Sequence, residues 1–208
     1  MMTNILELLG SNLDRGLISK LDKEVGIGDE EKTAAAVDSI SKIILAGVNR
    51  NAQSPEGLQS LNRALETDHQ GNIFNDVIGN LLNPEAKRSQ GLERTLNGAG
   101  ILRHVLGSKE SSVFDSLAKS TNMDKNQLLS LAVKIAPFVL GALGKAKKEQ
   151  GLDTGGLGSL LDGVMRSVST NNAAQGSFLN SILDQDGDGS IIDDVAGMGK
   201  KLFGGLFK

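Results

Sequence analysis

The sequence predicts an all-helical protein, and three of its features point that way. The 208 residues contain no Trp, no Tyr and only six Phe, so the core must be built from Leu, Ile, Val and Ala. Apolar residues recur at spacings of three and four, which is the period of a helix with one buried face. The 26 glycines fall largely at the ends of these segments, where they serve as caps and turns. We expect a multi-helical array of about nine or ten helices.

The first half of the chain, residues 1–110, contains five segments with this pattern. Asp29 precedes the second segment, whose first turn carries two acids where the helix dipole favours them. Ser54-Pro55 starts the third, since Pro is favoured at the first position of a helix. The five segments span 5–21, 30–51, 55–65, 73–82 and 84–106.

The second half, residues 111–208, repeats this order. A short segment over 113–118 comes first, and Asp124 is the expected cap of a long helix that reaches Leu143 with Pro137 inside it. A Gly-rich join and a short apolar segment follow. The polar stretch 167–177, SVSTNNAAQGS, is then expected to act as a linker to the C-terminal piece.

The two halves look like copies of one helical unit. Leu21, Ile27 and Val37 match Leu117, Met123 and Val133 at a constant offset of 96. The segment 68–79, DHQGNIFNDVIG, matches 186–197, DGDGSIIDDVAG, at six of twelve positions. These matches predict a duplicated unit covering about 18–82 and 114–199. The alternative is that segments rich in Leu, Gly and Asp resemble each other through composition alone.

Composition also limits the function. The net charge is −3 with acids and bases mixed along the chain, so there is no broad basic field and nucleic acid is not an expected partner. Cysteine is absent, which excludes disulfides and thiolate chemistry. The N-terminus lacks the pattern of a signal peptide, and no apolar run approaches the roughly 20 residues that span a bilayer. We therefore expect a cytoplasmic protein.

One acidic loop, 184–195, carries a recognisable chemistry. It has the residue types of the first positions of a calcium-binding EF-hand loop, with oxygen ligands at one, three, five and seven and Gly at six. Position twelve is Val195 instead of the usual Glu, so a carboxylate from ten or eleven would have to close the site. The expected ligands of a Ca²⁺ ion are Asp184, Asp186, Asp188, Ser190, and Asp193 or Asp194. The alternative is a metal-free turn in which Ser190 caps the last helix.

Other candidate sites are sparse. His69 and His104 are far apart in sequence and are expected on the surface. No nucleophile elbow, phosphate loop or dinucleotide fingerprint is found, so we expect no enzyme. The C-terminal segment 200–208, KKLFGGLFK, could lie on an anionic membrane, although packing on the core or between subunits is the favoured reading.

The helical halves and the C-terminal sequence 182–207, ILDQDGDGSIIDDVAGMGKKLFGGLF, resemble the bacterial proteins grouped as domain of unknown function family 937. The resemblance covers about residues 1–200. It implies a bacterial, helical, non-enzymatic protein, with the acidic loop at Asp184, Asp186 and Asp188 as a recurrent feature.

The sequence thus predicts a non-enzymatic interaction or structural protein that binds an unknown protein partner or itself. A divalent cation at the acidic loop is expected to order the C-terminal helix against the core. The alternative function is that of a peripheral membrane factor acting through the Lys/Phe tail.

Overall fold

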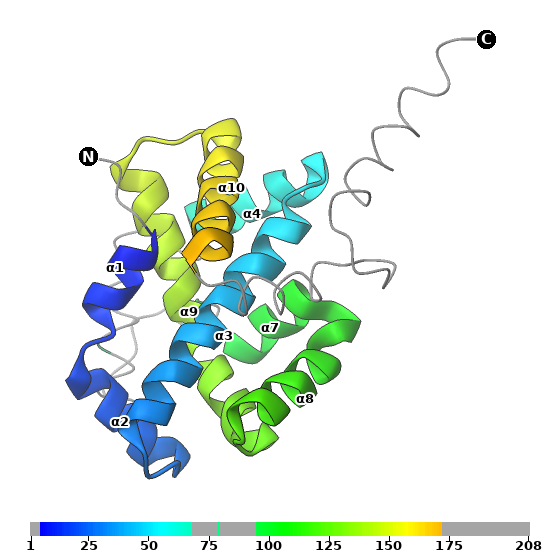
Figure 1. The fold of residues 1–208 in the computed structure, drawn as a ribbon. Coiled ribbons are helices and arrows are strands. Elements are labelled where there is room, and N and C mark those ends of the chain that lie inside the picture. The colour runs from blue at the N-terminus through cyan, green and yellow to red at the C-terminus, as the bar shows by residue number, and fades with distance from the viewer. Residues whose placement is uncertain (1–4, 68–78, 80–94, 172–208) are drawn as a thin grey trace.

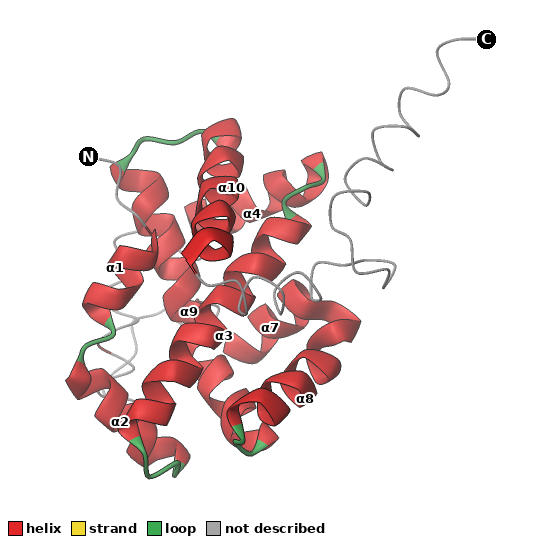
Figure 2. Cartoon of the chain, viewed as in Figure 1, coloured by secondary structure: helices red, strands yellow, loops and turns green. Residues whose placement is uncertain are grey.

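The computed structural model describes residues 5–67, 79 and 95–171, and these residues form helices joined by short loops (Figures 1 and 2). The N-terminal helices are α1 (Ile5–Asn12), α2 (Arg15–Val25), α3 (Glu30–Asn51) and α4 (Pro55–Thr67). The later ones are α7 (Gly98–Leu106), the 3-10 helix η1 (Gly107–Lys109), α8 (Glu110–Thr121), α9 (Lys125–Glu149) and α10 (Thr154–Asn171).

The predicted all-helical class is confirmed for the described residues, which contain no strand. They form eight α-helices, not the nine or ten expected, and one short 3-10 helix. Two boundaries also differ from expectation. The segment 5–21 is broken at Asp14, whose carboxylate accepts a hydrogen bond from the Leu17 N–H and starts α2. The polar stretch from 167 does not begin a linker, because α10 continues to Asn171.

Two long helices, α3 and α9, pack against each other at the centre of the fold. Ile40 and Ile44 of α3 are fully buried, as are Ile135 and Phe138 of α9. Every other described α-helix contacts one or both of this pair. Because α3 and α9 are covered on several sides, their buried residues extend around the helix rather than along one stripe.

The apolar character of α9 has a second consequence. By length and composition alone, the helix Lys125–Glu149 could cross a membrane. However, 72% of its most apolar 18-residue stretch is buried inside the protein. Burial of this kind is what the core helix of a globular domain requires. Pro137 lies within α9 and is itself buried.

Short connections set the position of the two long helices. At the α2–α3 corner, Gly26 has a φ of 75° and its N–H donates to the Asp22 carbonyl oxygen over 2.8 Å, while Asp29 caps α3. At the α8–α9 corner, Asn122 has a φ of 51° and donates to Ala118, while Asp124 caps α9. At both corners, a left-handed residue ends the preceding helix and an aspartate then caps the N-terminus of the long helix.

Helix α7 approaches both long helices unusually closely through glycines. A Cβ atom on Gly47 of α3 would lie 2.5 Å from Val105 Cγ1, and one on Gly98 would lie 1.8 Å from the Val133 carbonyl oxygen of α9. Real Cβ atoms do not approach other atoms so closely, so α7 can keep this position only while these two residues are glycine.

The substitution Gly98→Ala should therefore destabilise the fold by about 3 kcal/mol or more, because α7 must move away from α9. Gly163→Ala is the matched control, since it lies in exposed helix with no atom within 4 Å of the added Cβ. It should stabilise the fold by about 0.5–1 kcal/mol. Urea unfolding followed by circular dichroism measures both, and equal effects of the two changes would contradict this packing.

The α2–α3 corner also contains a buried polar contact. Asp22 is 7% exposed, and its Oδ1 accepts hydrogen bonds from the Asp29 N–H at 2.9 Å and from the Thr33 hydroxyl at 2.7 Å. Thr33 is fully buried. A buried polar group without a hydrogen-bond partner destabilises a fold, and here Asp22 and Thr33 supply a partner to each other.

Asp22→Ala should cost about 2 kcal/mol of stability because it leaves the Thr33 hydroxyl without its acceptor. The double variant Asp22→Ala/Thr33→Val should recover about 1 kcal/mol of that loss, since a methyl group replaces the orphaned hydroxyl. A double-mutant cycle by thermal unfolding measures the coupling. Additive losses in the double variant would show that the pair is not coupled.

Candidate functional site

The described surface contains a groove between α4 and α7 with a volume of about 810 Å³. Its bottom is formed by the C-terminal end of α3 and by Leu140 from the middle of α9. The apolar residues that line it are Val48, Leu61, Ala64, Ile101, Val105 and Leu140. The polar residues that line it include Arg50, Asn51, Glu56, Ser60, Asn97 and His104. We refer to it as the α4–α7 groove.

The apolar lining of the groove is only partly covered. Val48, Val105 and Leu140 belong to the buried core, whereas Leu61 and Ile101 are half-buried. These two side chains come from facing walls, Leu61 from α4 and Ile101 from α7. They leave apolar surface in a concave place, where a ligand with apolar side chains would remove it from water.

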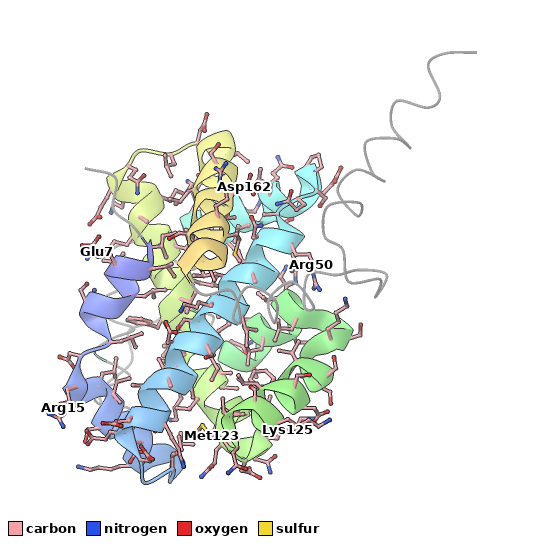
Figure 3. All side chains as sticks on the ribbon, viewed as in Figure 1. Glu7, Arg15, Arg50, Met123, Lys125 and Asp162 are labelled. Carbon is pink, nitrogen blue, oxygen red and sulfur yellow. The ribbon has the colours of Figure 1, made fainter. Side chains whose placement is uncertain are left out.

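The α7 wall is fixed by side chains from the last turn of α3. Arg50 Nη2 donates to the Val105 carbonyl oxygen at 3.2 Å, and Asn51 Nδ2 donates to the His104 carbonyl oxygen at 3.0 Å. These carbonyls belong to the last turn of α7, where the helix supplies no partner of its own. Figure 3 labels Arg50 at this end of α3. The contacts hold the end of α7 on the end of α3 and keep this side of the groove in place.

The α4 wall begins at Pro55, shortly after the end of α3. Ser54 Oγ accepts a hydrogen bond from the Gly57 N–H at 3.0 Å and so caps α4. A Cβ atom on Gly57 would lie 1.8 Å from the Asn51 carbonyl oxygen, which leaves no room for a side chain. Gln53, in the same connection, donates to Asp162 of α10 at 3.4 Å.

The far end of α4 is held on α9 by an ion pair. Lys147 Nζ lies 2.8 Å from Glu66 Oε1, and Asn62 Nδ2 donates to the same oxygen at 3.1 Å. The hydrogen bond from Lys147 lowers the pKa of Glu66 below its usual value of 4.5, with a further contribution from Asn62. The Lys147 side chain is only 12% exposed, whereas that of Glu66 is 56% exposed.

The sequence-predicted metal ligands, Asp184, Asp186, Asp188, Ser190, Asp193 and Asp194, lie outside the described residues, as do His69 and the segment 200–208. Within the ranges that the structure describes, no group of three or more His, Asp or Glu side chains is placed to hold a metal ion. His104 is exposed, as expected, and it lines the groove.

Sequence reasoning did not find the groove. Leu61 lies in the predicted segment 55–65 and Ile101 in the predicted segment 84–106, and the apolar pattern of these segments does not distinguish a half-buried position from a buried one. The groove exists because four helices from distant parts of the chain meet there, which local periodicity does not encode.

Comparison with known proteins decides the family. The family model described as bacterial protein of unknown function (DUF937) matches residues 7–146. The chain belongs to this family. The match begins within α1, ends within α9 and does not reach the acidic loop at 184–195. No curated protein and no solved structure matches the chain. The DUF937 description states no activity, so the geometry of the groove carries the functional argument.

The ion pair at the far end of α4 gives a prediction for this DUF937 member. Since the folded-state pKa of Glu66 is lowered, its contribution to stability is present above the usual pKa and is lost as pH falls through the lowered value. Glu66→Gln should lower the melting temperature slightly at pH 7 and have no effect at the acid end.

The control for this change is Glu56→Gln, at the other end of the same helix. Thermal unfolding between pH 7 and pH 3 measures both variants. A loss for Glu66→Gln that is independent of pH would show that the ion pair with Lys147 does not stabilise α4 on α9.

Proposed function

We propose that this DUF937 member acts by binding rather than by catalysis, and that its α4–α7 groove receives an apolar helical segment. The observation that carries this proposal is the pair of half-buried apolar side chains, Leu61 of α4 and Ile101 of α7, that line the same concave surface. A helix with apolar side chains at i, i+4 and i+7 can insert them into such a groove.

The walls of the groove favour this use. The α7 wall is tied to α3 by Arg50 and Asn51, and the α4 wall is anchored at both ends by Ser54 and by the Glu66–Lys147 pair. A preformed groove loses little conformational entropy when a ligand binds. Glu56, Ser60 and His104 are exposed at its rim, where they can pair with polar groups that flank the apolar face of a ligand.

The acidic loop adds a second part to the proposal. We propose that Asp184, Asp186, Asp188 and Ser190, with Asp193 or Asp194, bind a divalent cation, with Ca²⁺ as the expected ion. Binding would order the C-terminal residues against the helical core. The expected setting is the cytoplasm, and the expected partner is another protein or a second copy of the chain.

A calcium titration of the full-length protein, followed by hydrogen exchange, tests the loop. Protection should increase over residues 178–203 in the native sequence and stay unchanged in an Asp186→Ala/Asp188→Ala variant. Absence of protection in the native protein would leave the loop as a turn and remove the cation from this account.

We also propose that the fold is a duplicated unit in which α1 to α4 correspond to α7 to α10. Two observations support it. The corner caps recur at offsets of 96 for Gly26 and Asn122, and of 95 for Asp29 and Asp124. The sequence Ile5-Leu6 before Leu9-Gly10-Ser11 also recurs as Ile101-Leu102 before Leu106-Gly107-Ser108.

The packing of the outer helices supports the same correspondence. Helix α1 packs on α9 while α7 packs on α3, and α4 packs on α9 while α10 packs on α3. Helices α2 and α8 pack on the long helix of their own unit, and α7 packs on both long helices. At the positions of Asp22 and Thr33, the second unit carries Ala118 and Leu128, so a polar buried pair in one copy matches an apolar pair in the other.

The alternative function is membrane association through the tail 200–208, favoured by its Lys and Phe residues. Flotation of the full-length protein with vesicles containing anionic lipid distinguishes it. Flotation that is lost when 200–208 is deleted would support the membrane role, whereas flotation unaffected by the deletion would exclude it.

The groove proposal is tested with a dye at its rim. The chain has no cysteine, so Ser60→Cys provides a single attachment point for a polarity-sensitive dye beside the groove. Titration with a synthetic amphipathic peptide, with Leu on one helical face, should shift the dye emission to the blue. Ser11→Cys, on the exposed surface of α1, is the matched control and should not respond.

Ile101→Glu should weaken peptide binding at least about tenfold, because it places a charge on the apolar lining. Thermal unfolding checks that this variant remains folded. An equal response from the dye at Ser11, or unchanged affinity in Ile101→Glu, would contradict the groove as the binding site.

A further inference from the structure

We infer that the groove's resident ligand is a segment of the same chain, residues 178–183, with the sequence FLNSIL. The inference rests on the proposed function of the groove and names its occupant. Within this segment, Phe178, Leu179, Ile182 and Leu183 follow the i, i+1, i+4, i+5 spacing that places apolar residues on one helical face.

The last described helix runs beside the groove. Helix α10 packs on α3 and α4, and Asp162 of α10 accepts a hydrogen bond from Gln53, which lines the groove. Figure 3 labels Asp162 on α10 and Arg50 on α3, the helix between α10 and the groove's α7 wall. Leu58 of α4 lies 3.5 Å from a Cβ atom built on Gly158. The part of α10 around Gly158 and Asp162 therefore lies next to a wall of the groove.

The connection is long enough to return to the groove. Helix α10 continues for nine residues beyond Asp162, to Asn171, which carries the chain about 13 Å along the helix axis. Residues 172–177, NAAQGS, then separate α10 from Phe178. Seven Cα steps span up to about 25 Å when extended, which is longer than the stretch of about 13 Å that α10 adds beyond Asp162.

A short tether also favours this segment over others. Binding within one chain acts at an effective concentration of the order of millimolar for short flexible linkers, so even weak apolar contacts keep the groove filled. Leu202, Phe203, Leu206 and Phe207 repeat the same spacing, but their tether is longer and Gly204-Gly205 disfavours a helix between them. Segment 178–183 is therefore the favoured occupant, and an external partner must displace it.

Competition with the peptide tests this inference in the full-length protein. Replacing Phe178, Leu179, Ile182 and Leu183 by Ser should raise the affinity of the groove for the amphipathic peptide at least about tenfold, since the internal competitor is lost. The matched control replaces Leu202, Phe203, Leu206 and Phe207 by Ser and should leave the affinity unchanged.

The outcomes separate the two proposals. Peptide binding that is equal in both variants and the native protein would overturn the occupant but leave the groove as a binding site. Absence of peptide binding in all three would overturn the proposed function itself. An increase only in the 202–207 variant would also overturn the assignment to 178–183.

Disulfide trapping provides a direct second readout. Ser60→Cys/Ser181→Cys should form a disulfide within one chain at micromolar protein, at least about tenfold faster than the control pair Ser11→Cys/Ser181→Cys. Equal rates for the two pairs would overturn the inference. Disulfides that form mainly between chains would assign the groove to a second copy and overturn it as well.

Discussion

The contact between α3 and α9 is the interaction on which the rest of the fold depends. The chain has no cysteine to form disulfides, so the described domain is held by apolar packing. Complete burial of an Ile, Leu or Phe side chain contributes about 1.5–3 kcal/mol, and α3 and α9 each bury several. Every other described α-helix packs on α3, on α9 or on both. Loss of the α3–α9 contact would therefore remove the surface on which the outer helices pack.

The groove is a consequence of how the outer helices meet this pair. Helix α7 is drawn close by Gly47 and Gly98, whereas α4 has a single fully buried residue, Leu65, and is anchored mainly at its ends. One wall is therefore embedded in the core and the other lies on its surface. This asymmetry leaves Leu61 and Ile101 half-buried.

The all-helical class and the caps at Asp124 and at the Ser54-Pro55 start could be predicted from local signals, because capping depends on residues within one turn. The break at Asp14 was missed because the leucine pattern continues through it. The glycine contacts of α7 and the groove could not be predicted, since they depend on distances between distant segments. The predicted cation site stays a prediction, because Asp184 and its neighbours lie outside the described residues.

Native-state hydrogen exchange of the full-length protein tests the central role of the α3–α9 pair most directly. This account predicts that amides of Ile40–Val48 and Ile135–Leu143 exchange only through global unfolding, while those of α4 exchange through a smaller, local opening. If α4 were as protected as α3, or if α9 opened before the outer helices, the α3–α9 pair would not be the foundation of the fold.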